Sequence, residues 1–112
     1  GPVAALGQLT AVLSMNVAHI TPFAVTEGIM RGAARSLRPG GFLIFYGPFH
    51  VDGRATGPGN VSFDKDLRSR NPDWGIRDIA QLTALARPLG LSEPRVQSMP
   101  ADNRLLLFTR QP

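Results

Sequence analysis

The chain has 112 residues, of which 43% are hydrophobic and 18% charged, and it contains no cysteine. This length has room for one domain, and the composition excludes a disordered or fibrous chain. The lack of cysteine excludes disulfides and cysteine metal sites and fits a reducing compartment, so we expect a cytoplasmic protein. No apolar run approaches the roughly 20 residues of a membrane span, so no membrane partner is expected.

The net charge is +4 and the isoelectric point is about 11.1. Eleven of the twelve basic residues are arginines, and they are scattered from Arg31 to Arg110. A nucleic-acid-binding surface needs a clustered basic stripe or patch, so we expect no nucleic-acid partner.

The first half of the chain predicts a strand followed by a helix. Residues 1–10 are rich in glycine and alanine and are interpreted as a lead-in or linker, and residues 11–16 predict a buried strand. Thr21 and Pro22 predict a helix start, because a hydroxyl caps free amides and proline suits the first helical position. The Pro-Gly-Gly sequence at 39–41 predicts the end of that helix.

Residues 42–46 form an apolar run bounded by turn signals. Such a run is typical of a parallel-sheet strand buried on both faces. Ligands bind beyond the carboxyl ends of parallel strands, so we expect the loop from Tyr46 to Gly53 at an active site. The connection over 47–77 is predicted to be mostly irregular, with a short helix at 63–70.

The second half predicts a helix and two strands. Asp78 is predicted to be the N-cap of a helix that begins at Ile79. Strands are predicted at 95–99 and 105–109, and their link is too short for a parallel crossover, so this pair should be antiparallel. The whole order predicts an α/β fold whose sheet is mostly parallel, with a C-terminal antiparallel strand and flanking helices.

Three motifs in this order point to a known family. They are Asn16-Val17-Ala18-His19-Ile20-Thr21-Pro22, Tyr46-Gly47-Pro48-Phe49 and Asn71-Pro72-Asp73-Trp74-Gly75-Ile76-Arg77-Asp78. In them the chain resembles the C-terminal half of a class I S-adenosylmethionine-dependent methyltransferase, and within that class the methyltransferase-like 26 family. The resemblance implies a partial Rossmann-like methyltransferase sheet, with 11–112 as the C-terminal portion of the domain. It also implies S-adenosylmethionine as cofactor and a small-molecule substrate.

One part of the family pattern has no counterpart here. Such enzymes hold the cofactor chiefly with a glycine-rich turn after their first strand, and no such turn precedes Ala11. Gly57-Pro58-Gly59 is a weak match, because it is expected to open no helix. We therefore expect the chain not to be active by itself.

Candidate site residues follow the first predicted strand. By the resemblance, Asn16, Val17 and Ala18 would contact the cofactor, and His19 would act as a base or orient the substrate. The alternative is that His19 only caps a helix or binds a backbone carbonyl.

Other candidates lie in the long connection. Tyr46, Phe49 and Trp74 are predicted to line a substrate pocket, although aromatic residues are more often part of the core. Asn60 belongs to the same predicted substrate-binding set. Arg77 would bind a carboxylate or phosphate, or else tie its loop to a neighbouring aspartate. With two histidines and no cysteine, no metal site is expected.

A second function class remains open, that of a non-catalytic remnant or interaction module. In the resembling fold, the strand at 11–16 pairs on its free side with a strand that is absent here. This leaves Ala11 to Met15 as an apolar edge with unpaired amides, which is a template for pairing with another chain. We therefore expect a homodimer or a complementing chain.

Overall fold

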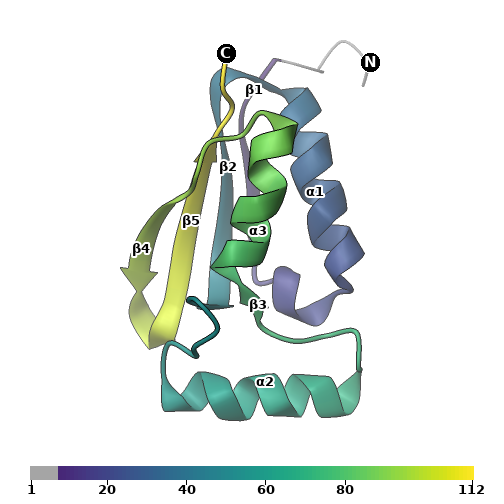
Figure 1. Ribbon diagram of the computed structural model, residues 1–112, viewed down its shortest axis with the longest axis vertical. Coiled ribbons are helices and arrows are strands. Elements are labelled where there is room, and N and C mark those ends of the chain that lie inside the picture. The colour runs from purple at the N-terminus through teal and green to yellow at the C-terminus, as the bar shows by residue number, and fades with distance from the viewer. Residues whose placement is uncertain (1–7) are drawn as a thin grey trace.

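The computed structural model describes residues 8–112, which form one mixed sheet with two helices, α1 and α3, packed on one of its faces (Figure 1). No described helix is long and apolar enough to cross a membrane. The elements in chain order are β1 (Leu9–Met15), η2 (Ala18–Ile20), α1 (Phe23–Ser36), β2 (Leu37–His50), α2 (Pro58–Arg70), β3 (Arg77–Asp78), α3 (Ile79–Ala86), η3 (Arg87–Leu89), β4 (Arg95–Met99), η4 (Pro100–Asp102) and β5 (Asn103–Thr109).

The strand order β1-β2-β5-β4 makes β2 and β5 the central strands, and the two-residue β3 pairs with the end of β2. β1 runs parallel to β2, whereas β5 runs antiparallel to both β2 and β4. This topology confirms the predicted mixed α/β fold with a C-terminal antiparallel strand.

The hydrophobic core lies between one face of the sheet and the helices α1 and α3. Alternate residues of the central strands point into it, because successive side chains of a strand face opposite ways. The fully buried large side chains of the sheet there are Leu37, Leu43, Phe45, Phe49, Leu106 and Phe108. The rings of Phe45 and Phe108 meet edge to face with centroids 6.2 Å apart. Each such side chain contributes roughly 1.5–3 kcal/mol by leaving water.

β1 and β2 are each covered on one face only, which corrects the prediction that both strands are buried on both faces. Leu13 of β1 is 60% exposed and Phe42 of β2 is 39% exposed. β1 begins at Leu9, two residues before the predicted strand, and residues 1–7 of the predicted lead-in lie outside the described residues.

The start of α1 differs from the predicted one. The Thr21 hydroxyl donates to the carbonyl of Val17, and Pro22 is the N-cap without any side-chain cap. Thr21 therefore closes the turn before the helix and does not cap it, which corrects the prediction. The helix ends at Ser36, close to the predicted stop, and the Pro-Gly-Gly sequence itself lies inside β2.

The two helices of the second half, α2 and α3, begin with different N-terminal signals. α2 is longer than the predicted short helix and begins directly after Gly57, with proline at its first position. The prediction that Gly57-Pro58-Gly59 opens no helix is therefore wrong, because proline at this position already has a helical φ. α3 confirms its prediction: the Asp78 carboxylate accepts from the amide of Ala80 at 2.9 Å, and Gln81 completes the capping box.

Candidate functional site

The candidate site lies where β1 ends beside β2, which continues past this point to His50. The backbone amide of Asn16 donates to the carbonyl of Tyr46 at 2.7 Å, which joins the residue directly after β1 to β2. Asn16 has φ 55°, a left-handed conformation that asparagine tolerates better than most residues. Gly47 lies against it with φ 154°, and a Cβ there would be 3.4 Å from Asn16 Oδ1. The carboxyl end of β1 thus presents an asparagine amide beside the bare backbone of Gly47 in β2.

His19 follows the end of β1 in the chain and lies in the short helix η2. It is 7% exposed, and its ring meets that of Phe63 from α2 with centroids 5.5 Å apart. Its carbonyl accepts from the amide of Gly75 at 3.1 Å. Burial lowers the pKa of His19 below its ordinary value, because the charged imidazolium loses hydration. The ring is therefore neutral at pH 7 and is able to accept a proton.

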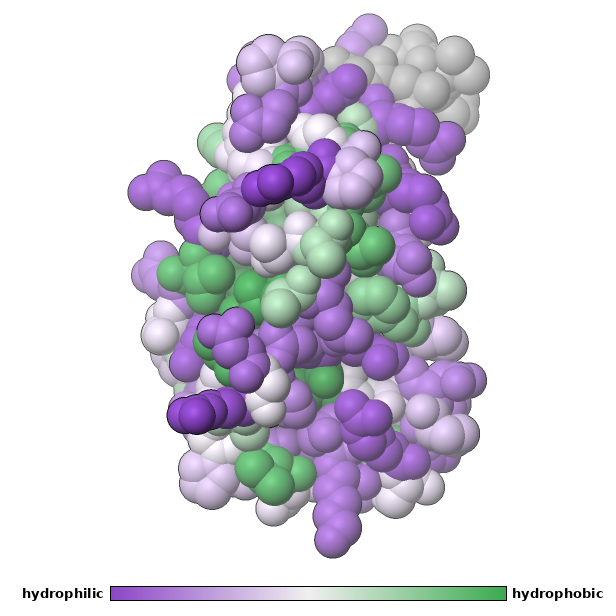
Figure 2. Space-filling model, in the orientation of Figure 1, coloured by the Kyte–Doolittle hydropathy of each residue, from purple (hydrophilic) through white to green (hydrophobic). Residues whose placement is uncertain are grey.

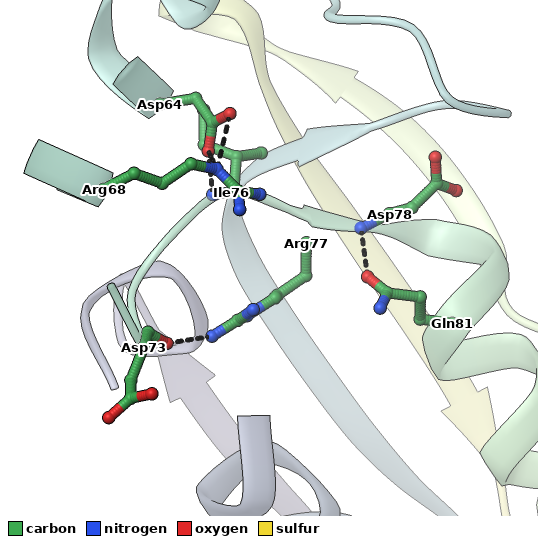
Figure 3. A network of polar contacts seen from close by, with 7 residues as sticks. All are labelled: Asp64, Arg68, Asp73, Ile76, Arg77, Asp78 and Gln81. Atoms are coloured by element: carbon green, nitrogen blue, oxygen red, sulfur yellow. Dashed lines mark hydrogen bonds and ion pairs between the residues drawn. The ribbon is translucent and has the colours of Figure 1, made fainter. Parts of the chain in front are cut away.

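Arg77 ties η2 to the loop over 71–76. Its Nη2 donates to the carbonyl of Thr21 at 3.0 Å and to that of Asp73 at 2.6 Å (Figure 3), and its Nε donates to that of Ala18 at 3.4 Å. The guanidinium also lies over the ring of Phe23, 5.4 Å from its centroid. Burial, followed by repulsion from Arg68, lowers the pKa of Arg77. Arg77 therefore ties its loop through main-chain carbonyls, that of Asp73 among them, and not through an aspartate carboxylate.

Asp64 fixes the same loop from the side of α2 (Figure 3). Its Oδ1 accepts from the amide of Ile76 at 2.7 Å, and its carboxylate accepts from Arg68 Nε at 3.1 Å. The loop that carries Trp74 is therefore held on both sides, by α2 and by η2.

The structure brings some of the predicted site residues together and separates others. Asn16, His19 and Tyr46 share the carboxyl end of the β1–β2 pair, and the Trp74 loop adjoins His19 through Gly75. Phe49 is 1% exposed in the hydrophobic core, because β2 continues through it with unbroken alternation.

Asn60 lies in a different contact, between α2 and the turn after β4. Its Nδ2 donates to Thr56 Oγ1 at 2.8 Å and to the carbonyl of Asp102 at 3.2 Å. Asn60 is buried, and its amide joins the start of α2 to the turn after β4.

The sequence analysis missed two residues that shape the site. Phe63 forms the wall against which the His19 ring packs, and Gly75 leaves room for Arg68, whose guanidinium carbon would be 2.9 Å from a Cβ at that position. The signal for Gly75 was the glycine itself, because glycine suits a positive φ, here 151°, and a close neighbour. No local pattern pointed to Phe63.

Comparisons with known proteins agree with this fold. A family model described as "Protein of unknown function (DUF938)" matches residues 2–110. The chain is similar to human N-acetylserotonin methyltransferase in complex with SAM, with a TM-score of 0.80 and 11% identity, over 96% of this chain and 31% of that one. It is also similar to the S-adenosylmethionine-dependent methyltransferase SibL, with a TM-score of 0.74 and 20% identity, over 95% and 32% of the two chains.

An O-methyltransferase family protein from Burkholderia thailandensis matches with a TM-score of 0.74 and 19% identity, over 91% of this chain and 30% of its own. At these identities the likeness shows only that the chain shares its fold with part of these structures. The chain spans about a third of the length of these solved structures.

Proposed function

The chain belongs to the DUF938 family of proteins of unknown function, and from this premise we propose that it is the C-terminal part of an S-adenosylmethionine-dependent methyltransferase. The observation that carries the proposal is the hydrogen bond from Asn16 to Tyr46, at the carboxyl end of β1 and beside the parallel strand β2. Ligands of α/β sheets bind beyond the carboxyl ends of strands. A closer kinship with the methyltransferase-like 26 family, supported by the motifs at 16–22 and 71–78, and a cytoplasmic location, supported by the lack of cysteine, belong to the same proposal.

The residues at this edge fit one side of the cofactor. Asn16 is exposed, and the missing side chain of Gly47 leaves space beside its amide. Asn16 would hold polar groups of the cofactor, with the backbone of Val17 and Ala18 beside it. The cofactor supplies an electrophilic methyl group. The neutral ring of His19 would accept the proton of the nucleophile or orient it, and Tyr46 and Trp74 would face the small-molecule substrate.

A second candidate function, from a different class, is an interaction module without catalysis. It is favoured by β1, which pairs only with β2 among the described residues and exposes Leu13 and Met15. In this reading the chain would bind a second copy or another protein through the free edge of β1.

An NMR titration of the ¹⁵N-labelled chain with S-adenosylmethionine tests the proposed function. We expect ligand at about 1 mM, the concentration scale of weak binding by half a site, to shift the amide signals of Asn16 to His19 and of Gly47. Asn16→Ala should abolish these shifts. Gln111→Ala, which removes an exposed amide two residues after Thr109, the partner of Phe42 at the far end of the β2–β5 pair, should leave them unchanged.

ATP serves as the ligand control, because it shares the adenosine but lacks the methionine part. Shifts that are equal with ATP, or signals at 16–19 that do not move, would contradict cofactor binding at this edge and leave the interaction module as the better account.

A further inference from the structure

Three arginines that are far apart in the sequence line one cleft, which we call the arginine cleft. Arg31 and Arg35 lie one turn apart on α1, and Arg110 directly follows β5. The cleft has a volume of about 400 Å³. The rest of its wall is apolar and consists of Ala34, Pro88 and Leu89. Figure 2 shows separate apolar patches surrounded by hydrophilic residues on the side of the molecule that carries α1 and α3. The fold therefore gathers into one place basic residues that are scattered along the chain.

The positive charge of the arginine cleft is not balanced by carboxylates. The ion pairs of the described residues join other arginines to their carboxylates, so none of the three has an ion pair there. Glu27 lines an adjoining pocket with Arg31 but forms no ion pair with it among residues 8–112. Basic residues near a helix C-terminus usually offset its partial negative charge, and Arg35 lies in the last turn of α1. The C-terminal ends of α1 and α3 together supply only about one negative charge, so about two of the positive charges remain for a ligand.

Arg110 is held in place before any ligand arrives. Its amide donates to the carbonyl of Gly41 and its carbonyl accepts from the amide of Gly40, both at 2.9 Å. Its Nη1 donates to the carbonyl of Leu37, the C-cap residue of α1. One hydrogen bond leaves most of the N–H donors of a guanidinium for a ligand. Because this side chain is already ordered, binding costs less rotamer entropy than it would for a free arginine.

We propose that the arginine cleft binds a small organic phosphate monoester, with its phosphate on the three guanidinium groups and its organic part against Pro88 and Leu89. A monoester phosphate carries roughly −1.5 to −2 charges at pH 7 and three acceptor oxygens, and guanidinium groups bind phosphate in a bidentate manner. A carboxylate, with one charge and two oxygens, would leave part of this donor set unused. The volume of the cleft suits a small ligand.

The arginine cleft is separate from the candidate site at Asn16. Figure 1 shows the C-terminal ends of α1 and α3 near the C-terminus of the chain, at the end of the molecule away from β3 and α2. Arg110 meets β2 at Gly41, near the start of that strand, whereas Asn16 meets it at Tyr46. A ligand of the cleft would therefore not compete with S-adenosylmethionine, and its binding does not depend on the proposed function.

An NMR titration of the ¹⁵N-labelled 112-residue chain with phenyl phosphate tests this binding. At about pH 7.5 the phosphate is largely a dianion, and roughly 0.1 M salt screens unspecific attraction. We expect saturable shifts of the amide signals of residues 31–37, Leu89 and Arg110, with a dissociation constant on the order of 1 mM or lower. Arg31→Gln and Arg35→Gln should each weaken binding about tenfold, because each removes one charged donor. Both residues are exposed and glutamine has a similar helix propensity, so the variants should fold, which unchanged signals away from each substitution would show.

Arg54→Gln is the matched control, because it removes the same charge from an exposed loop residue that lies outside the cleft. It should leave the affinity unchanged. Phenyl phosphate should bind at least about threefold more tightly than inorganic phosphate, which lacks the apolar part, and than benzoate, which carries a single charge. The absence of saturable shifts at the cleft, an equal loss of affinity in Arg54→Gln, or binding of benzoate or inorganic phosphate as tight as that of phenyl phosphate would each overturn the proposal.

Discussion

The backbone amide of Asn16 donates a 2.7 Å hydrogen bond to the carbonyl of Tyr46, and this contact defines the candidate site. It extends the β1–β2 ladder by one residue beyond the end of β1 and turns the asparagine side chain away from the core. The left-handed backbone of Asn16 and the positive φ of Gly47 both occur at this point. Strained backbone that the surrounding fold maintains is common at functional sites.

Gly47→Ala should destabilise the chain, because alanine at φ 154° is strained and its Cβ would press on the Asn16 amide. We expect a loss of about 1–3 kcal/mol in the free energy of unfolding, measured with urea. Gly28→Ala is the control, since this α1 glycine has no atom within 4 Å of an added Cβ. It should stabilise the chain by roughly 0.5–1 kcal/mol. Equal effects of the two substitutions would contradict the special role of Gly47.

Arg77→Lys should cost about 1–3 kcal/mol of unfolding free energy, because lysine cannot reach three main-chain carbonyls in different directions. Arg70→Lys keeps an exposed pair with Asp66 and should change stability by less than about 0.5 kcal/mol. If Arg77→Lys left stability unchanged and weakened substrate binding alone, Arg77 would be a binding residue and not a structural tie.

The stability of the chain should fall as the pH is lowered from 7.5 to 5.5, in part because of His19. Its folded pKa lies below the ordinary value of 6.5, so the unfolded chain binds more protons in this range. The stabilising contribution is complete above pH 6.5 and is lost as the pH falls toward the folded pKa, by at most about 1.4 kcal/mol per pH unit. His19→Gln should flatten the urea midpoint against pH, and a profile of unchanged slope would show that the ring is not desolvated.

Leu43→Ala and Leu13→Ala compare the two faces of the sheet. Leu43 is fully buried, and its truncation should cost about 2–5 kcal/mol. Leu13 is 60% exposed, and its truncation should cost less than about 1 kcal/mol in the chain alone. Chemical unfolding of the isolated chain measures both values. A large cost for Leu13→Ala at low protein concentration would show that the sheet face away from α1 and α3 is already covered.

The sequence predicted the order and type of the elements because each had a local signal. The Asp78 capping box and the short link between β4 and β5 depend on residues that are near in sequence. The exposure of the second face of β1 had no such signal, because an apolar strand has the same sequence pattern whether or not a partner covers that face. The free edge of β1, in contrast, was expected from the resemblance, and β1 is at one end of the sheet order among residues 8–112.

The candidate site was predictable in its position but not in every member. Asn16 and His19 follow directly from the end of a strand, whereas Phe49 depends on where β2 ends. Since β2 continues to His50, Phe49 keeps the inward direction of Phe45 and joins the core. The contact of Asn60 with Asp102 spans 42 residues and leaves no trace in the local sequence.

The most direct test of the central claim is a calorimetric titration of S-adenosylmethionine into the 112-residue chain, with Asn16→Ala and Gln111→Ala as matched variants. We predict weak binding, on the order of 1 mM, that is lost in Asn16→Ala and kept in Gln111→Ala. No binding to the unsubstituted chain, or binding that Asn16→Ala leaves unchanged, would contradict the claim that this edge is part of a methyltransferase site.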